Sequence, residues 1–242
     1  MTIANSGNHE IDLPSVRPEL VEGPRPELVE GARPELVEGL RPFDGLRTVR
    51  AQGGRAQTRG VHHLALNTDD MKMTIDFYSD VLGMPLVHAL KVPPGLGTGA
   101  GNRGNPPFEN LRHYFFDAGG DSLLAFFEIP KGAKDKADRD AIAAMQHCSF
   151  AVTEERFKQL CVRLRDAGVA LIGPIPVGAG TWSVYFFDPN GIRLELSFQE
   201  GDDDAISVVA RWTQTREQAL AELRTMSDDT RWLDEVTRHL PA

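Results

Sequence analysis

The alternation of apolar and polar positions predicts one strand, one helix and three further strands between residues 60 and 129. The first strand covers 61–67, and the helix covers about 71–82 with Asp69 or Asp70 as its N-cap. The remaining strands are expected at 84–92, 112–117 and 122–129.

The same order of elements returns between residues 145 and 199. A strand at 146–152 precedes a helix that Thr153 caps, and two strands' worth of residues follow before a hairpin at 185–195. Asp188-Pro-Asn-Gly191 supplies the turn of this hairpin. The fold class is therefore α+β: two tandem β-α-β-β-β modules (60–129 and 145–199) are expected to pair into an open mixed β-barrel around a central cavity, with the helices outside.

Residues 1–58 have a different pattern from the modules. The heptapeptide Arg-Pro-Glu-Leu-Val-Glu-Gly begins at Arg17, Arg25 and Arg33, and each copy carries a proline and a glycine that interrupt helix and strand. Eight residues are too few for a solenoid repeat, so this segment is predicted to be a disordered tail.

Residues 201–242 return to helical periodicity. The first amphipathic segment contains Trp212, Leu220 and Leu223, and Ser227 is expected to cap a second one. The domain organisation is thus a tail at 1–58, a two-module domain at 59–200 and a C-terminal helical extension, which offers a packing surface for a homodimer.

Composition limits the function classes. The net charge of −9 argues against general nucleic-acid binding. Two cysteines provide no disulfide framework, and no run of 18 apolar residues or signal peptide is present. We expect a cytoplasmic protein that acts on a small molecule and contacts neither nucleic acid nor membrane.

Four residues recur in corresponding places of the two modules: His63 and Glu128 in the first, His147 and Glu195 in the second. A single histidine in a strand is more often a core residue with hydrogen-bonded ring nitrogens than a metal ligand. A glutamate in a strand often pairs with a surface arginine. The recurrence favours a divalent metal site instead. Two histidines and one carboxylate suit Fe(II), whereas a fuller nitrogen and oxygen shell suits Zn, Ni or Mn.

The sequence resembles the vicinal oxygen chelate superfamily, which includes glyoxalase I, type I extradiol dioxygenases, fosfomycin-resistance enzymes and bleomycin-binding proteins. The resemblance covers residues 60–199 and is carried by His63-Leu-Ala-Leu, Phe77-Tyr78, Leu82-Gly83, Asp188-Pro-Asn-Gly and Glu195. It implies paired modules that enclose a metal site.

The second hairpin also fits the extradiol dioxygenase signature through Tyr185, Asp188-Pro189, Gly191 and Glu195. The resemblance implies that His63, His147 and Glu195 bind Fe(II) and that Tyr185 hydrogen-bonds the substrate. The acid/base histidine that the signature expects is missing, because positions 176–178 are Pro, Val and Gly. His113 or Tyr114 are the candidates to replace it.

Glu128 favours a different branch of the superfamily. Glyoxalase-type isomerases use four protein ligands, and Glu128 would complete such a set with His63, His147 and Glu195. The leading hypothesis is an Fe(II)-dependent extradiol-type ring-cleaving dioxygenase that acts on a small catechol-like substrate. The alternatives are a glyoxalase-type isomerase or lyase with Ni, Zn or Mn, and a non-catalytic binding protein of the bleomycin-resistance kind.

Overall fold

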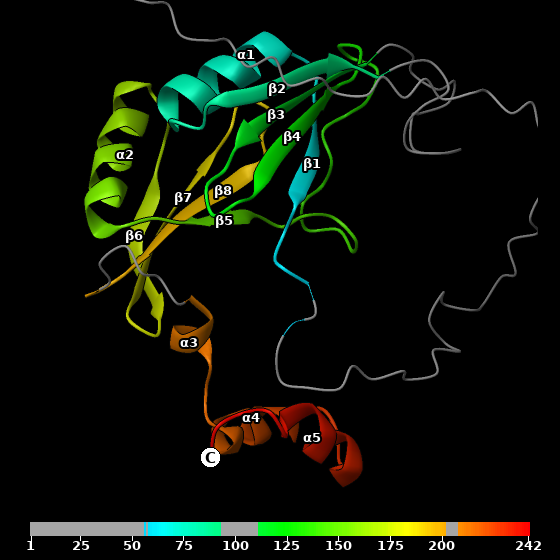
Figure 1. The fold of residues 1–242 in the computed structure, drawn as a ribbon, viewed down its shortest axis with the longest axis vertical. Coiled ribbons are helices and arrows are strands. Elements are labelled where there is room, and N and C mark those ends of the chain that lie inside the picture. The colour runs from blue at the N-terminus through cyan, green and yellow to red at the C-terminus, as the bar shows by residue number, and fades with distance from the viewer. Residues whose placement is uncertain (1–55, 57, 93–110, 202–207) are drawn as a thin grey trace, which may run out of the picture. The chain divides into compact units, whose positions relative to one another are not determined.

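The computed structural model describes residue 56 and residues 58–92, 111–201 and 208–242 (Figure 1). The predictions for the N-terminal repeats lie outside these residues. The described residues form the two modules and three C-terminal helices.

The described residues of the first module form four strands and one helical segment. Its elements are β1 (His63–Thr68), α1 (Met71–Ile75), the π-helical η1 (Asp76–Val81), β2 (Leu86–Lys91), β3 (Arg112–Asp117) and β4 (Leu123–Glu128). The strand order is β1-β4-β3-β2, with β1 parallel to β4 and the other neighbours antiparallel.

The helical segment of this module has the predicted start and end. The Asp70 side chain accepts a 3.0 Å hydrogen bond from the backbone N–H of Met73, which satisfies a free donor at the helix N-terminus. Gly83 has φ of 73°, in the left-handed region that glycine adopts without strain. The helix is not uniform between these points, because the π-helical turn follows Ile75.

The second module repeats this plan. Its elements are β5 (Cys148–Ala151), α2 (Glu154–Asp166), β6 (Ile172–Gly178), β7 (Thr181–Phe187) and β8 (Arg193–Gln199). The strand order β5-β8-β7-β6 matches that of the first sheet. Thr153 caps α2 as predicted, by accepting a 3.2 Å hydrogen bond from the backbone N–H of Arg156. The predicted α+β class with two β-α-β-β-β modules is confirmed.

The two modules form two four-stranded sheets with a common core. Across the described ranges, no strand of one sheet pairs with a strand of the other, so the expected barrel is not closed by hydrogen bonds. The core instead contains side chains from the helices and from one face of each sheet: Phe77, Tyr78, Phe116, Phe126, Phe157, Leu164, Phe186 and Leu196. Apolar burial therefore joins the modules on their helical side.

Strand alternation determines which side chains face away from this core. In β8, Leu194 and Leu196 are buried in the core, which directs Glu195 to the opposite face of the sheet. In β4, Leu124 and Phe126 occupy the core-facing positions. The face opposite the core is the one that carries the candidate chemistry of the second sheet.

The turn between β7 and β8 contacts the first module directly. The Tyr78 hydroxyl donates a 3.1 Å hydrogen bond to Asp188, and the Thr68 hydroxyl donates one of 2.8 Å to the side-chain oxygen of Asn190. Asp188 also closes its own turn, since its carboxylate accepts a 2.7 Å bond from the N–H of Ile192. The Asp-Pro-Asn-Gly turn thus connects the modules as well as the strands.

The C-terminal extension contains α3 (Val208–Trp212), α4 (Arg216–Leu223) and α5 (Thr230–Thr237). Asp229, and not Ser227 as predicted, caps α5; the Ser227 hydroxyl instead accepts a bond from the N–H of Asp229. Arg216 holds α4 against α5 through a 2.6 Å ion pair with Asp234. Within the described ranges, no helix is long and apolar enough to cross a membrane.

Candidate metal centre

His147 and Glu195 form the centre of the site. His147 lies immediately before β5, and its Nε2 is 2.9 Å from Oε2 of Glu195 on the neighbouring strand β8. Glu195 is only 5% exposed, while the imidazole retains 35% of its exposure. A buried carboxylate needs polar partners, and this imidazole supplies one at the mouth of the site.

The other polar atoms of this pair also have partners. Nδ1 of His147 contacts Oε1 of Gln146, so the ring nitrogen opposite Glu195 is held by an amide oxygen. Oε1 of Glu195 accepts a 2.9 Å hydrogen bond from the Ser197 hydroxyl. A neighbour that takes the N–H of a metal-binding histidine fixes its tautomer and orientation. Both side chains are therefore oriented before any ligand arrives.

Tyr185 is the third member of the constellation. It pairs with Glu195 across β7 and β8, is hydrogen-bonded to that carboxylate, and packs its ring edge-on against His147 with centroids 5.7 Å apart. Burial, and then the hydrogen bond and charge of Glu195, raise the pKa of the Tyr185 hydroxyl. The Arg193 guanidinium lies over the Tyr185 ring, 4.4 Å from its centroid. Tyr185 therefore remains a protonated donor at neutral pH.

The spacing of the two side chains suits two ligands of one ion. Two donors that each lie about 2.1 Å from a metal, at right angles, are about 3 Å apart. The 2.9 Å separation of His147 Nε2 and Glu195 Oε2 fits this geometry. In the part of the chain that the structure describes, however, no group of three His, Cys, Asp or Glu side chains is close enough to hold an ion.

His63 occupies the position in the first module that His147 occupies in the second. In the first sheet Leu64 pairs with Leu124, and in the second sheet Cys148 pairs with Leu194. His63 is the residue before Leu64, and His147 is the residue before Cys148. Nδ1 of His63 lies 2.9 Å from Nδ1 of His62, and its ring packs near Phe115. The structure does not bring His63 to the His147–Glu195 pair.

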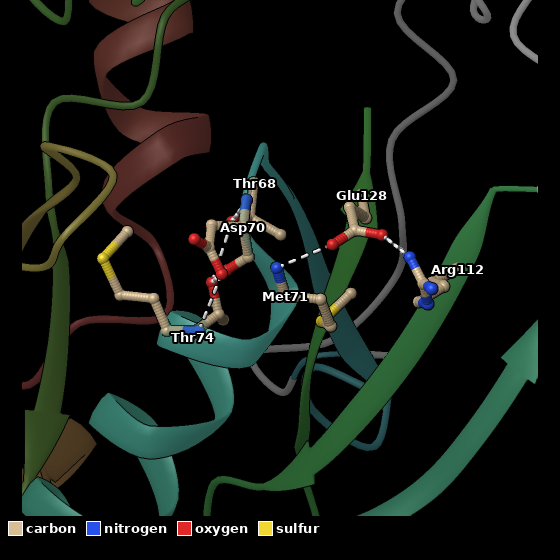
Figure 2. A network of polar contacts seen from close by, with 7 residues as sticks. Thr68, Asp70, Met71, Thr74, Arg112 and Glu128 are labelled. Carbon is tan, nitrogen blue, oxygen red and sulfur yellow. Dashed lines mark hydrogen bonds and ion pairs between the residues drawn. The ribbon is translucent and has the colours of Figure 1, made fainter. Parts of the chain in front are cut away.

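Glu128 lies on the core-facing side of the first sheet, opposite to the face that carries His63. Figure 2 shows its carboxylate between the backbone N–H of Met71, at 2.8 Å, and the guanidinium of Arg112. Side chains alternate along β4, so Glu128 points to the same core-facing side as Leu124 and Phe126. On that side it accepts a hydrogen bond from the N-terminus of α1. The structure does not bring Glu128 to the His147–Glu195 pair.

Strand register identifies the residue that corresponds to Glu195. Tyr185 pairs with Glu195 in the second sheet, and Phe115 pairs with Ala125 in the first. Glu195 also pairs with Ser149 on β5, as Ala125 pairs with Ala65 on β1. The counterpart of Glu195 is therefore Ala125, which has no metal-binding atom, and only the second sheet carries a carboxylate at this position.

His113 and Tyr114 lie on opposite faces of β3. His113 stacks on Phe127 with centroids 3.7 Å apart, and its Nδ1 lies 3.2 Å from the carbonyl oxygen of Phe126. Burial, together with the nearby charges of His63 and His88, lowers the pKa of His113. Tyr114 packs against the core instead. Only His113 therefore shares a face with His63.

The site opens into a cavity of about 550 Å³ beside the second sheet. Its walls come from all four strands of the second sheet, with two residues of α3, and include His147, Ser149, Ala151, Val177, Thr181, Tyr185, Glu195, Ser197, Gln199, Val208 and Trp212. The cavity combines a polar strand face with apolar side chains, as expected for a site that binds a small organic molecule.

The sequence model of the Glyoxalase/Bleomycin resistance protein/Dioxygenase superfamily matches residues 60–196, which is more than half of the chain. The chain belongs to this superfamily.

Solved structures of this superfamily resemble the chain at low identity. A glyoxalase/dioxygenase from Nostoc punctiforme is 22% identical, with 64% of this chain and 98% of that chain covered and a TM-score of 0.46. A glyoxylase/bleomycin resistance protein/dioxygenase domain from Frankia sp. EAN1pec is 22% identical over 60% and 96% of the two chains, with a TM-score of 0.46. The fosfomycin resistance protein FosX from Listeria monocytogenes is 16% identical over 60% and 96%, with a TM-score of 0.41.

Sequence reasoning missed several residues of the site in this superfamily member. Gln146, Ser197 and Gln199 have no motif of their own, although the alternation of β8 puts Ser197 and Gln199 on the face of Glu195. The same alternation in β4 (Leu-Leu-Ala-Phe-Phe-Glu) puts Ala125 and Glu128 on opposite faces of the first sheet.

Proposed function

We propose that this member of the superfamily is a metal-dependent enzyme, and that its best-supported activity is an Fe(II)-dependent extradiol-type cleavage of a small catechol-like substrate. The observation that carries the proposal is the contact of His147 with the buried carboxylate of Glu195, with Tyr185 beside it, in the wall of a cavity. The position of Glu128 on the other face favours a two-histidine, one-carboxylate site over the four-ligand site of glyoxalase-type enzymes.

The proposed ligands are His147, Glu195 and His63. Since His63 does not reach the other two within one chain, we propose that His63 of a second copy supplies the third donor. Two copies related by a twofold axis would then form two equivalent sites. The first sheet supports this assignment, since it presents His63 at the equivalent register position without a carboxylate of its own.

A divalent ion at these ligands supplies Lewis-acid activation of a chelated substrate and, when it is iron, redox chemistry with O₂. Gln146 and Ser197 hold His147 and Glu195 in place, so that little reorganisation is needed on binding. The Tyr185 hydroxyl keeps its proton because its pKa is raised, and it would exchange its hydrogen bond to Glu195 for one to a substrate oxygen.

His113 is the proposed proton acceptor. Its lowered pKa keeps the imidazole neutral at pH 7, and it lies on the same sheet face as His63, so it would enter the site with that histidine. Tyr114 is a poorer candidate, because its ring packs into the core and its hydroxyl is hydrogen-bonded to Arg112.

The test starts from protein purified without oxygen. Bound metal is measured per chain, and O₂ uptake is followed with a panel of catechols after Fe(II) is added. We expect Fe(II)-dependent uptake that His147→Ala abolishes, while His239→Ala, at an exposed histidine of the C-terminal extension, leaves it unchanged. Tight Ni or Zn without O₂ uptake would favour an isomerase or lyase. Absence of any bound or activating metal would favour a binding protein.

A further inference from the structure

The helix α3 of the C-terminal extension supplies part of the cavity wall. Val208 and Trp212 line the cavity, and their spacing of four residues puts them on one face of the helix. Val209 of the same helix is 79% exposed and lies outside the lining. The match to the superfamily ends at residue 196, so this wall comes from outside the matched domain.

Contacts with Glu200 place α3 near the end of β8. The Arg211 guanidinium donates a 3.3 Å hydrogen bond to the backbone carbonyl of Glu200, the residue that follows this strand. The strands hold Glu200 in turn, since its N–H donates a 3.0 Å hydrogen bond to the carbonyl of Gly180 and its carboxylate accepts one of 2.7 Å from the indole of Trp182. Glu195 lies five residues earlier, which corresponds to about 16 Å along a strand. The α3 wall is therefore at the end of the cavity away from Glu195.

The surface that a ligand can touch at this end is mainly apolar. Trp212 is 51% exposed and Val208 is 43% exposed, whereas the polar residues Thr181 and Gln199 are only 4% and 5% exposed. Val177 of β6 adds a half-buried apolar side chain on the sheet side of the cavity. An aromatic ring or another apolar group can therefore cover Trp212, and it gains free energy from the area that it removes from water.

The charged groups of the lining belong to the other end. Among the cavity-lining residues that the structure describes, Glu195 is the one carboxylate, His147 is the one imidazole, and none is a lysine or an arginine. An ionised group at the α3 end would lose water without gaining an oppositely charged lining residue. The lining thus favours an uncharged group at this end.

We propose that Trp212, Val208 and Val177 form an apolar compartment that binds a neutral, apolar group of the substrate and selects for it. The chelating head of the same substrate is held at His147 and Glu195, so this part of the inference rests on the proposed function. The substrate class is a catechol-like head that carries an uncharged aromatic or aliphatic substituent. Trp212 acts as a specificity-determining residue that the C-terminal extension contributes.

The test compares two matched catechols. One carries a 2-phenylethyl group at position 4, and the other carries a neutral polar 2-carbamoylethyl group there. Titration calorimetry with Zn(II)-loaded protein measures both affinities without turnover. We expect the phenylethyl compound to bind about 10-fold more tightly, because its ring is removed from water at Trp212. Equal affinities would overturn the proposal.

Three variants locate the effect. Trp212→Ala is expected to reduce the advantage of the phenylethyl compound to about 2-fold or less, and Val177→Thr, which adds a hydroxyl to the sheet side, should reduce it about 3-fold. Val209→Ala, on the same helix but outside the lining, should leave it unchanged. An advantage that survives in Trp212→Ala would contradict the assignment. An advantage that depends on Trp212 but not on Val177 would place the ring on the outer surface of α3, and the compartment would be rejected.

A second measurement separates this proposal from the proposed function. If no metal is taken up and neither catechol binds, the metal site is wrong, and the compartment is tested in metal-free protein with 2-phenylethanol and propionamide. The indole N–H resonance of Trp212, identified by its loss in Trp212→Phe, is expected to shift with 2-phenylethanol alone. No shift would reject the compartment, whether or not the protein binds metal.

Discussion

The hydroxyl of Tyr78 in the first module donates a 3.1 Å hydrogen bond to the carboxylate of Asp188 in the second. Both residues are buried, and Asp188 closes the turn that leads into the strand of Glu195. The contact therefore links the shared core of the two modules to the strand that carries the site.

Removal of this contact should destabilise the protein without changing its chemistry. Tyr78→Phe is expected to lower the free energy of unfolding by about 2 kcal/mol, because a hydrogen bond to a buried carboxylate is lost. Urea denaturation measures the change. Tyr114→Phe is the control, since its hydroxyl contacts Arg112 within one module. Equal losses in both variants would argue against a special role of the intermodule contact.

Asp188 should also make stability depend on pH. Burial raises the pKa of its carboxyl above the ordinary value of 3.8, and hydrogen bonds from Asn190, Ile192 and Tyr78 only partly oppose this. The folded chain thus binds this proton more tightly than the unfolded chain, so the contribution of Asp188 is present at low pH and is lost as pH rises through the folded-state pKa. The difference in unfolding free energy between wild type and Asp188→Asn should fall as pH increases from about 3.5. A flat or rising difference would contradict this.

Glu128 and Glu195 should have different roles. Glu195→Gln is expected to reduce metal affinity by about 100-fold or more, since it removes a carboxylate that we propose as a direct ligand. Glu128→Gln should leave metal binding unchanged and instead cost about 1–2 kcal/mol of stability, because it weakens the bonds to Met71 and Arg112. Calorimetric metal titration and urea denaturation distinguish the two. Loss of metal in Glu128→Gln would restore the four-ligand site.

Subunit complementation tests the origin of the third ligand. His63→Ala and Glu195→Gln should each be inactive alone. After joint refolding, a mixed dimer would contain one site with all ligands intact if His63 acts across the dimer, and about a quarter of the wild-type activity should return. His147→Ala mixed with Glu195→Gln is the control, because both residues lie in one module and no complete site can form. No recovery in the first mixture would place the site within one chain.

Tyr185 should act on turnover and not on metal binding. Tyr185→Phe removes a donor placed beside Glu195 and is expected to lower kcat about 100-fold, with bound Fe(II) retained. Stopped-flow measurement of O₂ consumption reports kcat, and metal analysis reports the ion. A parallel loss of metal would show that the hydroxyl only supports Glu195.

Local signals in the sequence predicted most of the fold. Asp70, Thr153 and Gly83 act at short range, through caps and a left-handed backbone position, and the structure uses all three as expected. The exception is Ser227, where the neighbouring Asp229 is the better placed oxygen for the N-terminus of α5. Such a choice between two capping residues that are two positions apart depends on where the first turn begins.

The candidate site was only partly accessible from the sequence. The sequence by itself determined the two modules, the histidines at or just before the start of their first strands, and Glu195 between two core leucines, because the strands and helices follow from periodicities of two and 3.6 residues. Tertiary structure decided that Glu128 faces the helix and that Ala125 is the counterpart of Glu195. These outcomes depend on register between strands far apart in the chain, and a displacement of one residue reverses the face of every side chain.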